Sequence, residues 1–505
     1  MNRKIVFMLF VVFGFGYFLR VMYLPRLALT FGYDQARDAY VTQQILSGDL
    51  KILGPPASTQ GLYHGVFYYY LLAPAYFLGK GSPVVAAYWI ALVNSLTILV
   101  VFSLGFLMTR KIGTALLSAF LYAISFEATQ YAVWLSNPTI AAFFVPLSYL
   151  GLWLWTKEGK GWGVILAGVG LGLSIQAEVF LLYHIVPFTI WLLIRKEQLN
   201  FRSLVNFFVA LFFSLLTMII AEVKFGFRGI IGASSLFASQ EGAGVAKGLG
   251  DILVLFFNQI GKVFAFSTYP GNVGYGGIFV IVLIALTIAS LRKGKSDTWR
   301  LFLLCWLLSH LTVVSVGGTS TPFLLVGIGP AVCLLVGINI SEWWEKGYRL
   351  LGLAVLLIII FGNISMIRKE NVRGQTIFAI QKDMILSKQL SAIDYTYESA
   401  KGNEFSINSL TSPMWINIVW TYLYNWYGEP LYGYVPYWHG RGQEGQLSSL
   451  NISDHEVSDY YLVIEPMAGI PLRYLQETID IEDSYSKMIE EKYFGEIRIQ
   501  KRIKQ

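Results

Sequence analysis

The sequence predicts an all-α polytopic membrane bundle followed by a small α/β domain. Hydrophobic residues make up 55% of its 505 residues and charged residues only 14%, whereas soluble domains carry roughly 25% charged residues. Apolar stretches of about 20 residues, long enough to cross roughly 30 Å of hydrocarbon as a helix, recur as far as Ile367. From Arg368 onward charge returns over a domain-sized length.

We expect about eleven spans from these stretches. They cover residues 5–24, 83–108, 112–132, 138–155, 162–176, 179–194, 204–221, 276–291, 301–316, 322–340 and 350–367. The aromatic stretch 64–79 is expected to lie along the interface instead, because counting it as a span would place the basic pair after residue 109 on the wrong side. Its tyrosines suit that depth, where one side of a ring is apolar and its hydroxyl is wet.

The short loops predict the orientation, because positive residues resist translocation and stay cytoplasmic. Basic residues fall in alternate loops: Arg3 and Lys4, Arg110 and Lys111, Lys157 and Lys160, Arg195 and Lys196, Arg292 and Lys293, and Lys346 with Arg349. The sequence therefore predicts a multi-pass plasma membrane protein with a cytoplasmic amino terminus and an extracytoplasmic carboxy-terminal domain.

Three extracytoplasmic segments are too long for connectors, and function is expected there. They are residues 25–82 and 222–275, which belong to the membrane domain 1–367, and the soluble domain 368–505. In that domain, residues 459–464 are typical of a buried strand and 420–426 of an aromatic helix.

Composition excludes two classes of site. The net charge of +7 does not gather on one soluble face, so no nucleic-acid partner is expected. Cys305 and Cys333 both lie in apolar runs, which fits neither a disulfide framework nor a zinc site.

The first outer loop carries the candidate chemistry. Asp34 and Asp38 are four residues apart in a pattern that predicts a short helix ended by Gly48. On a helix this spacing places both carboxylates on one face beside Arg37. One carboxylate could accept a proton from an attacking hydroxyl while the other orients it or binds a cation. The alternative is a solvated acidic helix start that stabilises the helix dipole.

The sequence around Asp34, directly after the first span, resembles the first-loop signature of GT-C glycosyltransferases. The most similar group is the protein O-mannosyltransferase and aminoarabinose-transferase-like superfamily. Further resemblances follow in the family's order over residues 1–367: Gly54-Pro55-Pro56, the run 65–74, Asn137-Pro138, the run 172–176 ending in Gln176, and Glu222. Each motif alone is weak, and their order carries the resemblance.

The resemblance implies a polyprenyl- or dolichyl-phosphate sugar donor that reaches the site through membrane lipid, and inversion at the anomeric carbon. The acceptor, whether glycan, lipid or protein, is unknown. Asp34 would be the general base, and Asp38 or Gln35 would orient. If a metal takes part, Mg²⁺ or Mn²⁺ at Asp34 and Asp38 is the expectation. Residues expected to contact the donor or its phosphate are Arg37, Tyr40, His64, Asn137, Gln176, Glu178, Glu222, Lys224 and Arg228.

Two positions depart from the family's pattern. Gln35 stands where a second acid usually follows the catalytic Asp, and Glu178 stands where a His often follows the Gln. Two alternatives follow: Asp38 or Glu178 replaces the missing groups, or the chain has become an inactive binding subunit. Other outer cations that could hold the phosphate are Arg20, Arg26 and Lys262; each could equally be an ordinary flanking residue.

Two rival functions stay open. A lipid-linked glycan transporter or flippase would show internal repeats and ionisable residues at mid-membrane, and neither is found. A polysaccharide polymerase or ligase is chemically closer and would take a long glycan as acceptor. Asn137 is also expected to cap a helix that begins at Pro138.

Overall fold

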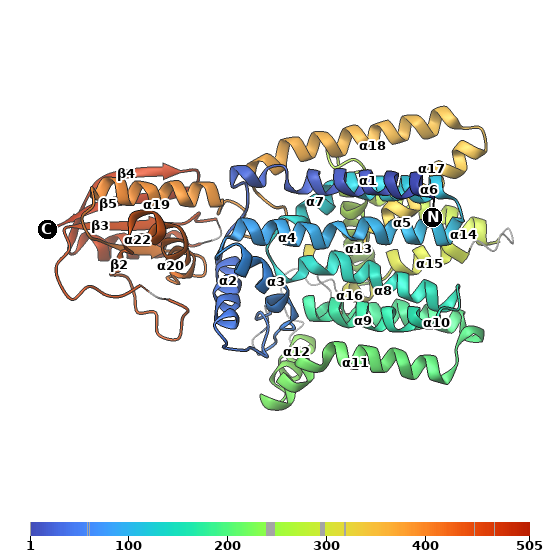
Figure 1. The fold of residues 1–505 in the computed structure, drawn as a ribbon, viewed down its shortest axis with the longest axis horizontal. Coiled ribbons are helices and arrows are strands. Elements are labelled where there is room, and N and C mark those ends of the chain that lie inside the picture. Colours follow the sequence, from blue (N-terminus) through green and yellow to red (C-terminus); the bar gives the residue numbers. More distant parts are fainter. Residues whose placement is uncertain are drawn as a thin grey trace.

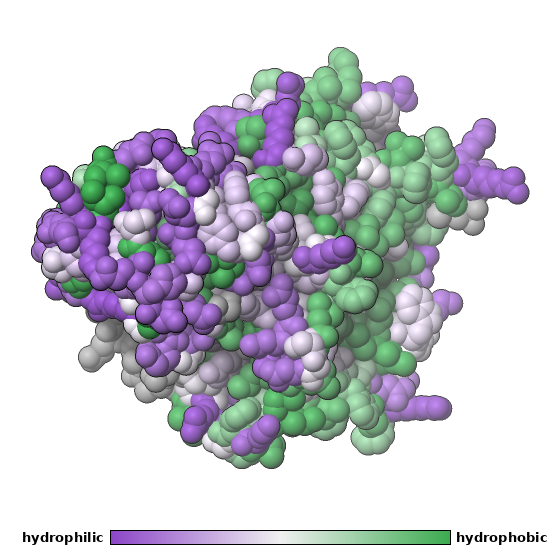
Figure 2. Space-filling model, turned by 60° about the vertical axis from the view of Figure 1, so that its left-hand side comes forward, coloured by the Kyte–Doolittle hydropathy of each residue, from purple (hydrophilic) through white to green (hydrophobic). Residues whose placement is uncertain are grey.

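The structure is a computed structural model that describes residues 2–57, 59, 61–238, 248–292, 298–317, 320–448, 450–468 and 470–505. A helical bundle occupies one end of the molecule and an α/β domain the other, with the amino and carboxy termini at opposite ends (Figure 1). Two helices of the first loop, α2 (Tyr33–Leu46) and α3 (Phe67–Leu78), lie between these parts. Hydrophobic residues cover the bundle and hydrophilic residues the domain (Figure 2).

The bundle is built from apolar helices. Its elements are α1 (Arg3–Val21), α4 (Pro83–Ser95), α5 (Thr97–Thr109), α6 (Ile112–Ile124), α7 (Phe126–Ala132), α8 (Ala141–Thr156), α9 (Gly161–Ala177), α10 (Ile185–Ile194), α11 (Phe201–Lys224), α12 (Arg228–Ala238), α13 (Leu249–Thr268), α14 (Gly276–Arg292), α15 (Thr298–Leu307), α16 (His310–Gly317), α17 (Gly329–Glu345) and α18 (Arg349–Glu370). Among the described residues, 7 helical stretches are long and apolar enough to cross a membrane, or 8 when a bent pair counts as one.

Helices occur at all the predicted spans, and the segment 222–275, predicted as one outer loop, holds a further long helix. That segment contains α13, whose 20 residues are long and apolar enough to cross a membrane. Asp251 and Lys262 lower the mean hydropathy of α13, and for this reason the helix was not predicted from the sequence. Helix α3 has only 12 residues, about 18 Å at 1.5 Å per residue. A helix of this length is too short to span the bilayer. This agrees with the prediction that residues 64–79 do not form a span.

Arg20 has a structural place inside the bundle. Helices α6 and α7 meet at an angle of 58°, and this bend frees backbone carbonyls of the last turn of α6. The Arg20 guanidinium donates to the carbonyls of Ala123 at 3.0 Å and Gly16 at 2.7 Å. Arg20 was a candidate to bind the phosphate, but its side chain is buried and bonds to these backbone carbonyls instead.

Basic loops that are distant in sequence meet at one end of the bundle. Arg110 pairs with Glu158, Lys111 with Glu345, and Arg300 with Glu342. The amino terminus lies at this end too, away from the α/β domain (Figure 1). This common placement is what the alternation of basic loops predicted, although Lys293 lies outside the described residues.

The carboxy-terminal domain is a five-stranded mixed sheet with helices, as predicted. Its strand order is β2-β1-β3-β5-β4. The strands β2 (Tyr437–Trp438), β1 (Phe405–Leu410) and β3 (Asp459–Ile464) are parallel, and β5 (Ile497–Lys504) and β4 (Ser486–Phe494) continue antiparallel. The helices are α19 (Leu386–Ala400), α20 (Ile418–Leu423), α21 (Glu429–Tyr432) and α22 (Leu472–Asp483). The predicted strand 459–464 is β3, and α20 begins the predicted aromatic helix.

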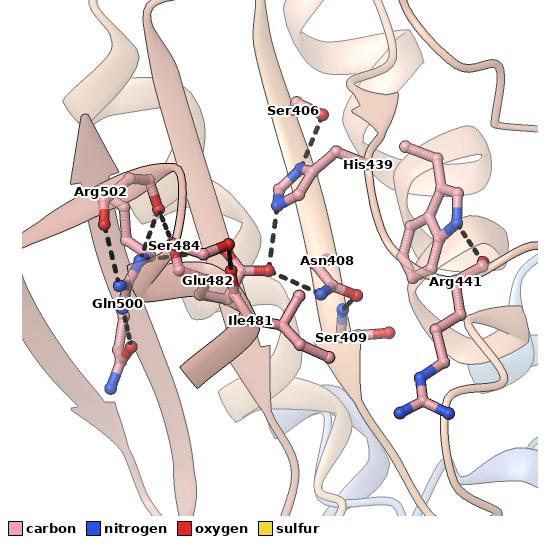
Figure 3. Close-up of polar contacts among 12 residues, drawn as sticks. Ser406, Asn408, Ser409, His439, Arg441, Ile481, Glu482, Ser484, Gln500 and Arg502 are labelled. Atoms are coloured by element: carbon pink, nitrogen blue, oxygen red, sulfur yellow. Dashed lines mark hydrogen bonds and ion pairs between the residues drawn. The ribbon is translucent and has the colours of Figure 1, made fainter. Parts of the chain in front are cut away.

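A polar cluster joins α22 to this sheet (Figure 3). His439 Nδ1 lies 2.8 Å from Ser406 Oγ, and its Nε2 lies 3.4 Å from Glu482 Oε1. Asn408 donates to the same Glu482 oxygen at 2.7 Å. The order Ser, His, Glu is that of a hydrolytic triad, but Ser406 is only 2% exposed within β1. The cluster therefore holds the domain together.

This cluster makes the domain sensitive to acid. Burial raises the pKa of Glu482, but hydrogen bonds from His439, Asn408 and Tyr485 outweigh it, so the pKa lies below its ordinary 4.5. A carboxyl with a lowered pKa stabilises the fold above its ordinary pKa and loses this contribution as the pH falls through the folded value. We expect Glu482→Gln to cost about 1.5–3 kcal/mol at pH 7 and to flatten the loss of stability below pH 4.5. Thermal unfolding as a function of pH measures this, with the exposed Glu477→Gln as control.

Candidate functional site

Helix α2 has strong local reasons to form where it does. Gly32 precedes its first turn, and the Gly32 N–H donates to Gln35 Oε1 at 2.9 Å, which satisfies one of the donors that a helix start leaves unpaired. At the other end, Gly48 adopts φ +99°, a conformation that favours glycine. The predicted helix ended by Gly48 is confirmed.

Arg37 joins the two predicted carboxylates. Its Nη1 donates to Asp34 Oδ1 at 2.7 Å, while Nε and Nη2 donate to Asp38 Oδ1 at 2.9 and 2.7 Å. The Asp34 side chain is 59% exposed, whereas that of Asp38 is 2% exposed. Asp34 can therefore meet a substrate directly. Asp38 holds the guanidinium in place from inside.

The inner side of this group contains unpaired polar atoms. Asp38 Oδ2 and the Tyr68 hydroxyl are buried without a hydrogen-bond partner among the described residues. Burial raises the pKa of Asp38 to about 7, with Arg37 opposing the shift. Burial, with the neighbouring Asp38 adding to it, raises the pKa of the Tyr69 hydroxyl well above its ordinary 10. A buried oxygen without a donor favours a polar group entering here. From the sequence, these tyrosines were expected only to anchor the chain at the membrane interface.

His64 and Glu178 form a second buried pair. His64 Nδ1 lies 3.6 Å from Glu178 Oε1, and it accepts the Val179 N–H at 3.2 Å. Burial, with Arg37 adding to it, lowers the pKa of His64 to about 3, and burial raises that of Glu178 to about 8. At neutral pH both side chains are thus largely uncharged. That Glu178 replaces a missing catalytic group stays a prediction.

Three predicted contacts serve the scaffold. The Gln35 amide donates to the Leu135 carbonyl at 2.9 Å, and Gln176 Oε1 accepts the Phe67 N–H that opens α3. Asn137 donates to the Ala177 carbonyl at 2.6 Å, at the end of α9. The expectation that Asn137 caps the following helix is wrong, because Ser136 is the N-cap residue and no side-chain bond caps it. The neighbouring end of α9 offered Asn137 a buried carbonyl instead.

The other predicted contacts lie around this core. Glu222 accepts the Ile230 N–H at 3.2 Å and so joins α11 to α12, where Lys224 and Arg228 are exposed. The Arg228 carbonyl lies beside Gly61 of the first loop. Tyr40 meets the carboxy-terminal domain, edge-on to Tyr422 at 5.2 Å. Local contacts unite Asp34, Arg37 and Asp38, while Arg228 of α12 borders the first loop at Gly61.

The carboxylates do not fit a metal ion well as they are placed. Among the residues that the structure describes, no group of three or more His, Cys, Asp or Glu side chains could hold one. Arg37 already binds both Asp34 and Asp38. We therefore derive no chemical step through Mg²⁺ or Mn²⁺.

Known structures share this architecture. ArnT from Cupriavidus metallidurans bound to undecaprenyl phosphate matches with a TM-score of 0.59 and 12% identity, over 99% of this chain and 98% of that one. The Archaeoglobus fulgidus oligosaccharyltransferase tethered with an acceptor peptide matches with a TM-score of 0.51 and 14% identity, over 83% of this chain and 63% of that one. The chain has the GT-C fold. No family model and no curated protein matches the sequence.

The structural match to ArnT covers more of the chain than the sequence motifs do. The motifs covered residues 1–367, whereas the match to ArnT covers 99% of this chain and so includes the carboxy-terminal domain. In this GT-C fold, the first-loop group of Asp34, Arg37 and Asp38 lies on an interfacial helix between the bundle and that domain (Figure 1).

Proposed function

We propose that this chain is a membrane glycosyltransferase that transfers a sugar from polyprenyl phosphate to an extracytoplasmic acceptor, with inversion at the anomeric carbon. The observation that carries the proposal is the exposed Asp34 carboxylate, held by the buried Arg37 on a helix between bundle and domain. A donor with a long apolar tail must arrive from the bilayer. Its phosphate then stays at headgroup depth, beside the first loop.

In the proposed reaction Asp34 accepts the proton of the acceptor hydroxyl or amine as that atom attacks the anomeric carbon. The bond between this carbon and the phosphate oxygen breaks, and polyprenyl phosphate leaves with the electron pair. Negative charge grows on the phosphate, so nearby cations stabilise the transition state. The exposed Lys224 and Arg228 are the proposed contacts, because the Arg228 backbone borders the first loop.

The proposed topology places this chemistry outside the cytoplasm. The ion-paired basic loops and the amino terminus lie at the opposite end of the bundle from α2 and the carboxy-terminal domain. Positive residues stay on the cytoplasmic side. Cysteine labelling of Asp49→Cys by a membrane-impermeant maleimide in intact cells tests this, and we expect labelling without permeabilisation.

A direct experiment tests the function. Membranes containing the chain are given radiolabelled sugars carried on undecaprenyl phosphate, and transfer to acceptor and release of the lipid phosphate are measured. Mass spectrometry of lipids and surface glycans with and without the gene identifies donor and acceptor together. Movement of an intact lipid-linked glycan across the membrane without cleavage would favour the flippase, and label found only on long glycan chains would favour the polymerase or ligase.

Removal of divalent metal provides a separate prediction. Because Arg37, rather than a metal, neutralises both carboxylates, we expect EDTA to leave transfer within about twofold of the untreated rate. Loss of transfer that Mg²⁺ or Mn²⁺ restores would contradict this and return the metal site to Asp34 and Asp38.

A further inference from the structure

A segment of the carboxy-terminal region crosses the start of the candidate catalytic helix. We call residues 374–385, which join α18 to α19, the strap. The Phe31 N–H donates to the Met384 carbonyl at 2.8 Å, and the Leu386 N–H donates to the Leu29 carbonyl at 2.9 Å. Between these two hydrogen bonds, Thr30 and Ile385 form an antiparallel β-bridge. These bonds fix the register of the strap against the residues that lead into α2.

Gln381 of the strap contacts the first turn of α2 directly. Its Oε1 accepts the Tyr33 N–H at 3.3 Å, one of the donors that no residue within the helix can satisfy. A Cβ atom at Gly32 would lie 2.6 Å from the same Oε1. A side chain at this position would therefore push the Gln381 amide away from the start of α2. Asp34, the next residue after Tyr33, lies in the turn that Gln381 holds.

The other end of the Gln381 amide is fixed by Glu465. Gln381 Nε2 donates to Glu465 Oε2 at 3.2 Å and also to the Ser412 carbonyl. Glu465 is 1% exposed. It accepts the Ser412 N–H at 2.9 Å and the Trp420 indole N–H at 3.1 Å. The Gln381 amide, the Ser412 N–H and the Trp420 indole all donate to Glu465. Glu465 therefore holds the nitrogen of the Gln381 amide, and the amide oxygen faces Tyr33.

The domain also contacts α2 farther along its length. The Tyr422 hydroxyl of α20 donates to the Gly81 carbonyl at 2.6 Å and lies 3.4 Å from Gln43 Nε2. Its ring lies against Phe31 at 5.6 Å and Tyr40 at 5.2 Å. These contacts restrain α2 beyond its first turn, whereas Gln381 bonds directly to the Tyr33 backbone beside Asp34.

We propose that Gln381 and Glu465 are positioning residues that fix the first turn of α2, and through it the carboxylate of Asp34, for transfer. The proposal rests on the proposed function. Neither residue touches the reacting atoms. Each acts through the backbone of Tyr33, and a misplacement of about 1 Å at a catalytic group can lower a rate on the order of 100-fold.

Hydrogen exchange tests the proposal without an activity assay. Gln381→Glu keeps an oxygen for Tyr33 but removes the amide N–H groups that Glu465 and the Ser412 carbonyl accept, so we expect its side chain to turn away. Amide exchange should then rise in residues 33–37 of the full chain in detergent, while exchange in β1 and β3 stays unchanged. The matched control is Gln476→Glu, an exposed glutamine on α22. Unchanged exchange at 33–37, or a rise throughout the domain, would overturn the positioning role.

Kinetics give the second readout, with the undecaprenyl-phosphate sugar that supports transfer as donor. We expect Gln381→Glu to lower kcat on the order of 100-fold with KM for the donor within about twofold. The double variant Gln381→Glu/Glu465→Gln, in which amide and carboxylate exchange places, should recover at least about tenfold of kcat. A purely structural defect would lower the melting temperature and would show no such recovery, which would also overturn the proposal.

The two proposals can fail separately. If Asp34→Asn keeps its activity, the proposed function fails, although the exchange result at residues 33–37 still stands. If Asp34→Asn is inactive while Gln381→Glu keeps its kcat, the positioning proposal fails and the base assignment survives.

Discussion

Asp34→Asn is expected to lower sugar transfer by about 100-fold to 10,000-fold, the range that general-base catalysis contributes. The amide has nearly the same shape but accepts no proton at neutral pH. Because the Asp34 side chain is 59% exposed, its replacement should leave folding unchanged. Transfer of radiolabel from an undecaprenyl-phosphate sugar, normalised to the amount of folded protein, measures the effect.

The control for this variant lies in the same loop. Asp49 is an exposed aspartate that pairs with Lys51, and Asp49→Asn makes the same chemical change at a site without proposed chemistry. We expect it to transfer sugar at the wild-type rate. Retained activity in Asp34→Asn would refute Asp34 as the base, and equal losses in both variants would point to the loop's net charge instead.

Arg37→Met is expected to abolish measurable transfer and also to destabilise the chain. Arg37 is the charged partner of the buried Asp38, and removing one partner of a buried ion pair costs about 3–5 kcal/mol. It also releases Asp34, which Arg37 contacts at 2.7 Å. Thermal unfolding in detergent measures the stability, and the labelled-donor assay measures transfer.

A double variant separates these two effects. Arg37→Met/Asp38→Asn removes both charges of the buried pair, so most of the lost stability should return. Transfer should remain absent, because nothing then orients Asp34. Recovery of transfer together with stability would show that Arg37 serves folding alone.

The first-loop group could be predicted from sequence because its contacts are local. Asp34, Arg37 and Asp38 lie within a single helical turn and a half, where spacing alone determines which side chains meet. The apolar helices were predictable for a similar reason, since each carries its own hydrophobic length. Helix α13 was missed where Asp251 and Lys262 interrupt that signal.

Contacts between distant elements could not be predicted in this way. The pairing of His64 with Glu178 joins the first loop to the end of α9, and Gln381 lies 348 residues after Tyr33. Asn137 bonds across to α9 rather than to its own helix. In each case the partner depends on how the chain packs, and no local pattern encodes it. Sequence thus predicted the acidic group but not the groups that fix its surroundings.

The long separation between the strap and the first loop has a consequence for biosynthesis. Phe31 and Gln389 are 358 residues apart, and Thr30 and Gly374 are 344 apart. A nascent chain emerges from its amino terminus, and domains generally fold as units during synthesis. The residues that lead into α2 therefore lack these partners until residues 374–389 have been synthesised and folded. On this basis a chain that stalls or terminates before residue 374 would form its apolar helices yet leave the start of α2 unsupported.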